Sequence, residues 1–302
     1  MGLEDKSVLI TGGSGFIGKN LIKRLKQEGA RIINISNDGE AEGAKTIDID
    51  LTKTDFSFLD NLHFDYVIHL AGFSSPRRSI DEKLTNKLNV DATERLFKRL
   101  ISSKIEKAVF MSSYIVYSSS NQNLAEDFPL EKSPGIYAKS KILAESCCDN
   151  LIRHGFPLVI FRLSNVYGPH QQWLPDEIPT LVPQLISDAL TKKEMNIQNG
   201  NPVRDYIYVG DVVEAVIQAV RNNYAGTLNL GTGMGTSVRE LANEISALTG
   251  SSAFFLNKDV VRAQRLVLDT SKAKNILNLT PKTSLREGLK KTISYYAEEI
   301  RT

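Results

Sequence analysis

A tyrosine and a lysine four residues apart are the clearest sign of chemistry in this sequence. Tyr137 and Lys141 stand in the run YAKSK at the start of a predicted helix over 137–154, so the two side chains lie on one helix face. A free tyrosine has a pKa of about 10 and is a poor base at neutral pH, whereas a nearby ammonium favours the phenolate. Lys141 can supply that ammonium. Taken alone, such a pair is more often a chance surface pair, so its surroundings decide the interpretation.

A serine ahead of this pair strengthens the chemical interpretation. Ser113 directly follows a predicted strand over 107–112. Open α/β sheets place ligand-binding groups at the carboxyl ends of their strands. The Ser113 hydroxyl could therefore donate to the same substrate oxygen that Tyr137 protonates. The three side chains together indicate a candidate acid/base centre.

A glycine-rich run, TGGSGFIG over 11–18, indicates a dinucleotide site. It joins a predicted strand over 8–11 to a predicted helix over 16–27, which is the context that such a run needs. Its first glycine permits a tight turn, the second lets backbone approach a pyrophosphate, and the third allows close helix packing. The helix N-terminus adds free N–H donors and the positive end of the helix dipole. The cofactor-binding residues predicted here are Gly12, Gly15, Phe16, Ile17 and Gly18.

The residues after the second predicted strand bear on the choice between NAD and NADP. An acidic residue in this region would hold the ribose hydroxyls of NAD. Ser36 has no charge to repel a 2′-phosphate, yet no Arg or Lys follows directly to attract one, and Asp38 could itself reach the ribose. Both cofactors therefore remain open. Asp50 and Leu51 are predicted adenine contacts, although a solvated carboxylate is the commoner role of a single Asp.

These candidate sites need a scaffold, and the hydrophobic pattern predicts one. Short β-rich runs alternate with helical patterns through the first half of the chain, which implies right-handed βαβ crossovers and a parallel sheet covered on both faces. The predicted fold class is therefore α/β, a doubly wound parallel sheet of the Rossmann type. The strands are predicted at 8–11, 31–36, 66–70, 107–112 and 158–163, and the helices at 16–27, 88–101 and 137–154.

Beyond about residue 167 this alternation breaks, and four prolines crowd residues 169–183. We expect residues 1–166 to form the dinucleotide-binding domain and residues 167–302 to form mainly a smaller C-terminal substrate-binding lobe. The segment over about 205–232 holds one helix pattern and one strand pattern, so we expect it to rejoin the sheet of the first domain.

The overall composition argues against several classes of protein. The chain has 302 residues, 41% of them hydrophobic, and a formal net charge of +2, so nothing global points to a nucleic acid or an acidic membrane. No stretch approaches the roughly 18 consecutive apolar residues of a membrane span, and the N-terminus lacks a signal-peptide pattern. The two cysteines are neighbours, and no His/Cys spacing suggests a metal site. We expect a soluble cytoplasmic protein.

Taken together, these runs make the sequence resemble the extended short-chain dehydrogenase/reductase family, in its NAD-dependent epimerase/dehydratase group. The matching motifs occur in the family's order from residue 11 to residue 274. They are TGGSGFIG (11–18), HLAG (69–72), NV (89–90), SSYIVY (112–117), YAKSK (137–141), RLSNVYGP (162–169), RDYIYVGDV (204–212), LNLGTG (228–233) and LDTSKAK (268–274). Each motif is weak alone, but the combination is highly specific and covers nearly the whole chain.

The resemblance implies a role for each matching residue. Tyr137 would be the acid/base, Lys141 would hold the nicotinamide ribose and lower the pKa of Tyr137, and Ser113 would complete the triad. The further cofactor-binding residues would be Ala71, Gly72 and Asn89, and the substrate-binding residues would be Ser75, Tyr114, Asn165, Arg204, Arg262 and Arg265. Arg204 and one of the last two arginines would bind the diphosphate of a sugar nucleotide. Without the resemblance, these arginines would be read as a solvated face and Asn165 as a turn or cap.

Two residues depart from one branch of the family. Related 4,6-dehydratases carry an Asp–Glu pair directly after the triad hydroxyl, because the elimination of water needs an additional acid and base. Tyr114 and Ile115 stand there in this chain. Ile115 cannot move a proton, so we do not expect dehydratase activity. Tyr114 could be an additional acid, or it could pack beside the sugar.

The resemblance implies a nucleotide-sugar enzyme, and three functions are weighed. The first is an epimerase that transiently oxidises a UDP-hexose, at carbon 4, with a retained NAD(P) cofactor. The second is an NADPH-dependent 4-ketoreductase of a deoxysugar nucleotide, which would use the same residues. The third is a non-catalytic nucleotide-binding scaffold, against which the intact triad argues. Family members often pair helices such as 88–101 and 137–154 into a dimeric four-helix bundle, so we expect a homodimer.

Overall fold

A seven-stranded sheet forms the centre of the computed structural model, which describes residues 2–172, 180–256 and 265–301. All neighbouring strands in this sheet run parallel, in the order β10-β6-β5-β4-β1-β2-β3. The strands are β1 (Ser7–Thr11), β2 (Arg31–Ser36), β3 (Lys45–Asp48), β4 (Tyr66–His69), β5 (Lys107–Ser113), β6 (Leu158–Leu163) and β10 (Gly226–Leu230). The predicted doubly wound α/β fold is confirmed.

The strand order reverses between β1 and β4. From β1 the chain builds β2 and β3 on one side and then returns to build β4, β5 and β6 on the other. At such a switch point the loops after the two central strands diverge and leave a crevice at the carboxyl edge of the sheet. The glycine-rich loop after β1 and the loop after β4 therefore flank the place where ligands bind in sheets of this kind.

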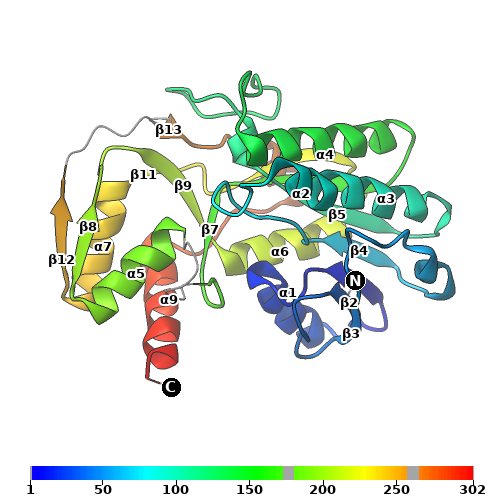
Figure 1. Ribbon diagram of the computed structural model, residues 1–302, viewed down its shortest axis with the longest axis horizontal. Helices are drawn as coiled ribbons and strands as arrows, with labels where there is room; N and C mark the ends of the chain where they lie inside the picture. Colours follow the sequence, from blue (N-terminus) through cyan, green and yellow to red (C-terminus); the bar gives the residue numbers. More distant parts are fainter. Residues whose placement is uncertain (1, 173–179, 257–264, 302) are drawn as a thin grey trace.

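Helices cover the two faces of the sheet as separate layers, which Figure 1 shows above and below it. One layer consists of α1 (Phe16–Gln27), α6 (Val209–Val220) and α8 (Ser271–Leu277), and the other contains α3 (Ala92–Arg99) and α4 (Ile136–Arg153). Successive strand side chains point to opposite faces, so on β5 Val109 packs into the first apolar layer and Ala108 into the second. Two separate apolar clusters thus clamp the sheet.

The second predicted helix starts earlier than expected. Helical backbone begins with α2 (Glu82–Asn86), passes through a π-helical turn, η2 (Lys87–Asp91), and ends beyond α3 in a 3-10 turn, η3 (Leu100–Ser102). The Asp81 side chain accepts a backbone N–H of the first turn at 2.9 Å and so caps this start. The first turns are mostly polar, which is why the apolar pattern alone placed the start at residue 88.

Smaller sheets and three helices pack around a third apolar cluster, to the left of the main sheet in Figure 1. In the larger of these sheets, β9 pairs with β7, β11 and β13, and in the other β8 pairs with β12. The elements are β7 (Asn165–Tyr167), α5 (Leu181–Thr191), β8 (Glu194–Ile197), β9 (Val203–Tyr208), β11 (Gly235–Ser237), α7 (Val238–Thr249), β12 (Ser252–Phe255), β13 (Arg265–Leu266) and α9 (Leu285–Glu299). Within the segment 205–232, the residues in β9 belong to this small sheet. Strand β10 instead joins the edge of the main sheet, and α6 packs against one face of that sheet.

Candidate active site

Ser113, Tyr137 and Lys141 meet at the carboxyl edge of the main sheet. Ser113 is the last residue of β5, and the other two lie in the first turns of α4, which packs against β5. The Lys141 ammonium donates to the Met111 carbonyl at 2.8 Å and lies 6.0 Å from the centre of the Tyr137 ring. The Ser113 hydroxyl lies near enough to the Tyr137 phenol to lower its pKa. The structure therefore brings the three predicted side chains into one cluster.

Burial dominates the proton chemistry of this cluster. It raises the pKa of Tyr137 to about 12, and the nearby Ser113 hydroxyl offsets only part of that change. It also lowers the pKa of Lys141 to about 8, against the opposing charge of Glu145. At neutral pH the phenol is therefore protonated and the amine is largely charged. The lowering of the Tyr137 pKa that we expected from Lys141 does not prevail, because removal from water disfavours the phenolate more strongly.

The glycine-rich loop has the shape that a dinucleotide cradle requires. Gly12 has a φ of 74°, and a Cβ there would lie 2.8 Å from the Ala71 backbone nitrogen. A Cβ on Gly18 would collide with the Gly12 carbonyl, because α1 presses against the loop. Gly15 is the N-cap of α1. Any side chain at the first or third glycine would fill the space that the loop needs.

The start of α1 supplies donors for an anion beside this cradle. Phe16 and Ile17 are its first two residues, and their backbone N–H groups have no carbonyl partner within the helix. No acidic residue stands in the first turn to compete for them. These donors and the open glycine loop fit the pyrophosphate of a dinucleotide.

Two side chains from β2 hold the glycine-rich loop in place. The Gly13 N–H donates to the buried Asn34 side chain at 2.8 Å. The Ser14 and Ser36 hydroxyls lie 2.7 Å apart, and Ser36 also accepts from the Asp38 N–H at 3.1 Å. Ser36 thus lies beside the loop at the carboxyl end of its strand. Asn34 is not among the predicted site residues, because its only signal in the sequence is a polar residue inside a predicted buried strand.

The loop after β4 carries Ala71 and Gly72 next to the glycine-rich loop. Asn89 is buried and bridges this loop to α4. Its side-chain oxygen accepts a loop N–H at 2.8 Å, and its amide donates to the Ser140 hydroxyl at 3.0 Å. Asn89 therefore braces the loop against the helix that carries Tyr137 and Lys141.

Asp50 and Leu51 have partners of their own. The Asp50 carboxylate accepts from the Thr52 N–H at 2.9 Å and from the Thr52 hydroxyl at 2.7 Å, and it pairs with Lys53 at 3.0 Å. The Thr52 hydroxyl is the main reason that the pKa of Asp50 is held down to about 2. Leu51 is buried in the apolar cluster beneath the turn. A contact of either residue with adenine stays a prediction.

The predicted sugar-binding residues gather after β5 and on β7 and β9. Tyr114 begins the η4 turn (Tyr114–Val116), and its buried hydroxyl accepts from the Asn165 amide at 2.5 Å. Burial raises the pKa of Tyr114, and the charge of Arg204 on β9 opposes that rise. Tyr206 is the register partner of Asn165. Its buried hydroxyl has no hydrogen-bond partner in the part of the chain that the structure describes.

Of the arginines predicted to bind the diphosphate, Arg204 and Arg265 lie on neighbouring strands of the small sheet. Leu266, next to Arg265 on β13, pairs in register with Arg204 on β9, so the two arginines stand on adjacent strands. Arg265 donates to the Asn123 side chain at 2.6 Å. Arg262 lies outside the described residues. Ser75 is buried in the loop after β4.

His69 fills a buried position beneath the triad, as an ordinary satisfied side chain. One ring nitrogen lies 2.6 Å from the Thr11 hydroxyl and the other 2.8 Å from the Thr93 hydroxyl. Burial lowers the pKa of His69 to about 3, and the Lys141 charge adds to that effect. The imidazole therefore stays neutral across the physiological range.

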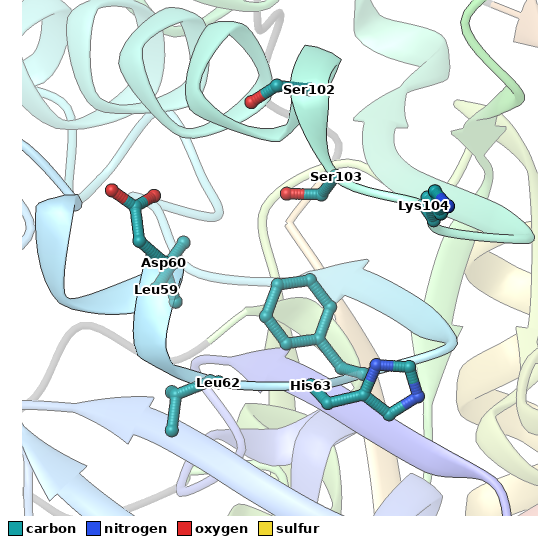
Figure 2. A pocket seen from close by; sticks show the side chains of 8 residues that line it. Leu59, Asp60, Leu62, His63, Ser102, Ser103 and Lys104 are labelled. Atoms are coloured by element: carbon teal, nitrogen blue, oxygen red, sulfur yellow. The ribbon is translucent and has the colours of Figure 1, made fainter.

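A separate pocket of about 350 Å³ lies at the opposite, amino edge of the main sheet. Its wall comes from the η1 turn (Ser57–Asn61) and from residues just ahead of β4 and β5, including His63 and Lys104. Figure 2 shows these side chains around the pocket. Because the triad stands at the carboxyl edge, this pocket plays no part in the site described above.

Comparison with known proteins identifies the class of protein. The chain belongs to the NAD dependent epimerase/dehydratase family, whose model matches residues 8–231. The predicted family is confirmed, and its NAD dependence agrees with the predicted class of cofactor. Among the described residues, no helix has the length and apolar character that crossing a bilayer requires.

Curated relatives match along nearly the whole chain but carry different activities. A UDP-N-acetyl-alpha-D-glucosaminuronate decarboxylase from Bacillus cytotoxicus is 28% identical, over 97% of this chain and 98% of that protein. A UDP-glucose 4-epimerase from Mycolicibacterium smegmatis is 29% identical, over 95% and 97%. A dTDP-D-glucose 4,6-dehydratase from Homo sapiens is 29% identical, over 98% and 91%.

Solved structures of epimerases are similar in fold. The UDP-glucose 4-epimerase of Thermotoga maritima, solved with UDP-glucose, has a TM-score of 0.90 at 27% identity and covers 97% of this chain and 99% of its own. A UDP-glucuronic acid 4-epimerase variant from Bacillus cereus, solved with a fluorinated UDP-sugar and NAD, has a TM-score of 0.86 at 25% identity, with coverages of 97% and 99%.

Proposed function

We propose that this protein is a nucleotide-sugar epimerase that interconverts UDP-hexoses at carbon 4 and retains NAD. The observation that carries the proposal is the cluster of Ser113, Tyr137 and Lys141 at the carboxyl edge, beside the glycine cradle. Ile115 follows this cluster and packs in an apolar group, where a dehydratase would need an acid or base. The relatives with 4-epimerase names support the choice.

The cofactor site supports NAD as the dinucleotide. The N–H groups at the start of α1 would hold the pyrophosphate, and Lys141 would donate to the nicotinamide ribose. When bound, NAD supplies the acceptor and the donor of hydride. The family description and the NAD in the Bacillus cereus epimerase favour NAD over NADP. Ser36 lacks a charge and leaves NADP as the alternative.

The chain's own residues then move the proton. Tyr137 takes the proton of the carbon-4 hydroxyl as hydride leaves that carbon, and Ser113 donates a hydrogen bond to the same oxygen. Because burial holds the pKa of Tyr137 at about 12, the phenolate needs help from its surroundings. Lys141, whose ammonium lies 6.0 Å from the centre of the Tyr137 ring, is the positive group placed to give it. After the keto sugar rotates within the site, hydride returns to the other face of carbon 4 and Tyr137 returns the proton.

The decisive experiment adds UDP-glucose to the purified protein without further cofactor. We expect UDP-galactose to form with no net change in absorbance at the reduced-nicotinamide band. If turnover instead requires added NADPH, consumes it in proportion to a 4-keto-6-deoxy sugar nucleotide and leaves UDP-hexoses untouched, the 4-ketoreductase replaces the epimerase. Dinucleotide binding without turnover of either substrate would indicate the scaffold.

A homodimer and a cytoplasmic location stay predictions. For the dimer, Ile101 and Leu143, on the helical layer of α3 and α4, are 59% and 40% exposed and would be covered if a second copy packed against this layer. Light scattering at micromolar concentration should report a dimer, and Leu143→Glu should weaken it. A monomer that is fully active would rule this assembly out.

A further inference from the structure

A buried ionic network lies directly behind the triad and has no role in the chemistry described so far. Glu145 and Arg162 form an ion pair at 2.7 Å, and their side chains are only 3% and 8% exposed. The Ser112 hydroxyl donates to Glu145, and Arg162 donates to the Tyr117 hydroxyl at 2.8 Å. A buried ion pair often adds nothing to stability relative to apolar residues of the same volume. Stability alone therefore does not explain why this ion pair lies behind the triad.

The network brackets Ser113 on both sides. Immediately before it, Ser112 is tied to α4 through Glu145. A few residues after it, Tyr117 is tied to β6 through Arg162, and the same hydroxyl donates to a buried amide oxygen on β10 at 2.7 Å. Ser113 thus belongs to a short segment fixed at both ends.

Two hydrogen bonds of opposite direction join α4 to the end of β5. The Lys141 ammonium donates from the helix to the Met111 carbonyl, and the Ser112 hydroxyl donates from the strand to Glu145. The donors and acceptors are neighbours on the strand and one turn apart on the helix. The helix cannot slide along the strand without breaking both bonds, so Glu145 and Lys141 fix the same register.

The charged and titratable groups that bear on Lys141 come from three elements. They are Tyr137, Glu145 and Cys148 on α4, His69 on β4, and Arg162 on β6 through its pairing with Glu145. Burial raises the pKa of the Cys148 thiol and of the Tyr137 phenol and lowers that of His69, so all three are neutral near pH 7. Among these groups, Glu145 alone places a negative charge opposite the Lys141 ammonium.

We propose that Glu145 is a positioning residue for the triad, which ties α4 to the end of β5 through Ser112 and keeps a negative charge one turn from Lys141. Arg162 makes this buried carboxylate tolerable, because an unpaired charge there would be strongly destabilising. The consequence for catalysis rests on the proposed function. The tether and the charge on Lys141 are properties of the protein itself.

Two variants separate the charge of Glu145 from its hydrogen bond with Ser112, and a third serves as the control. Glu145→Gln keeps an oxygen that can accept from Ser112 and removes the charge, whereas Ser112→Ala removes the tether and keeps the charge. Glu82→Gln is the matched control. Glu82, on α2, also pairs with a lysine of α4, Lys139, at 2.8 Å, but this pair lies on the exposed surface. Should Glu145→Gln fail to fold with Arg162 unpaired, the double variant Glu145→Gln/Arg162→Met removes both charges together.

The main measurement is the titration of Lys141 by NMR in protein labelled with ¹³C at lysine Cε, assigned by the signal that Lys141→Met lacks. Wild type should titrate with a pKa of about 8. We expect Glu145→Gln and the double variant to titrate about one pH unit lower, and Ser112→Ala and Glu82→Gln to titrate as wild type. With UDP-glucose, kcat at pH 7.5 should fall about threefold in Glu145→Gln with little change in KM, because a pKa one unit lower reduces the charged fraction of Lys141 at that pH from about three quarters to about one quarter.

The two proposals fail in different ways. An unchanged Lys141 titration in both Glu145 variants would overturn the positioning role, whatever the activity. A lowered pKa of Lys141 in the Glu145 variants, in a protein that does not turn over UDP-hexoses, would keep the positioning role and reject the epimerase. Loss of stability to urea without any change in the Lys141 titration or in the pH profile of kcat would reduce the ion pair to a structural element and overturn the proposal.

Discussion

The two halves of the candidate site differ in how folding uses their polar groups. Around the triad and the glycine loop, Lys141, Asn89 and Asn34 already hold partners within the protein. On the side of the small sheet, the buried hydroxyls of Tyr206 and Ser164 have no partner among the described residues. The first half is therefore organised for chemistry before any ligand arrives, whereas the second keeps hydrogen-bonding capacity that folding leaves unused. The triad and the glycine loop form the organised half of the candidate site, and the side of the small sheet is its recognition side, where two buried hydroxyls remain available.

The largest effect should come from breaking the organised half at its acid/base. Tyr137→Phe removes one oxygen and leaves the ring in place, so the fold and NAD affinity should persist while kcat falls by about a hundredfold or more. Steady-state kinetics with UDP-glucose measure the change. Tyr114→Phe, the same change on the recognition side, should lose far less. Near-wild-type turnover in Tyr137→Phe would move the proton transfer to another group.

A second test asks whether the burial of His69 in the organised half lowers the stability of the fold at acid pH. Burial holds the pKa of His69 at about 3, below its unfolded value of 6.5, so the unfolded chain binds more protons between these pH values. Stability is therefore lost as the pH falls through this window, by about 2–3 kcal/mol from pH 6.5 to 4.5 for this group. His69→Gln should flatten that part of the profile in urea unfolding, and exposed His63→Gln should not. Parallel slopes for wild type and His69→Gln would contradict the burial argument.

A third test concerns the cofactor end of the organised half. Ser36→Asp places a carboxylate where the Ser14 hydroxyl and the Asp38 N–H already meet an oxygen, so the loop should keep its shape. We expect NADP affinity to fall about tenfold through repulsion of the 2′-phosphate, with NAD affinity equal or better. Calorimetric titration of both dinucleotides decides the question. Equal NADP affinity in the two proteins would place the ribose away from Ser36.

The smallest expected effect lies on the recognition side. Arg265→Ala should raise the KM for UDP-glucose about fivefold and leave kcat unchanged, because a diphosphate contact is made equally in the ground and transition states. Asn123→Ala, which removes a hydrogen-bond partner of Arg265 but no charge, is the control. A fall in kcat at constant KM would instead link Arg265 to the reaction and weaken the contrast between the halves.

What the sequence could predict follows the range of the interactions involved. The strands, the helix over 16–27 and the pairing of Tyr137 with Lys141 depend on neighbours within a few residues, and the structure has them where expected. The helix start at Glu82 was missed because a polar first turn hides its apolar face.

Interactions across longer distances in the chain escaped prediction. Asn34 meets a partner 21 residues away, Glu145 meets Ser112 33 residues away, and Arg265 meets Asn123 142 residues away. Tertiary packing brings such partners together, so no local pattern in the sequence reveals them. The raised pKa of Tyr137 was missed for the same reason, since burial depends on the whole fold.

The position of β10 at the edge of the main sheet has a consequence for how the protein is made. β6 is buried along its full length and lies between β5 and β10, yet β10 begins only at Gly226, long after β6 ends at Leu163. While the ribosome synthesises the intervening segment, β6 presents a bare apolar edge, and such edges recruit other chains into aggregates. Yield in the cell should therefore depend on how fast residues 164–225 are translated. A chain stopped short of residue 226 should aggregate rather than persist as a minimal dinucleotide-binding unit.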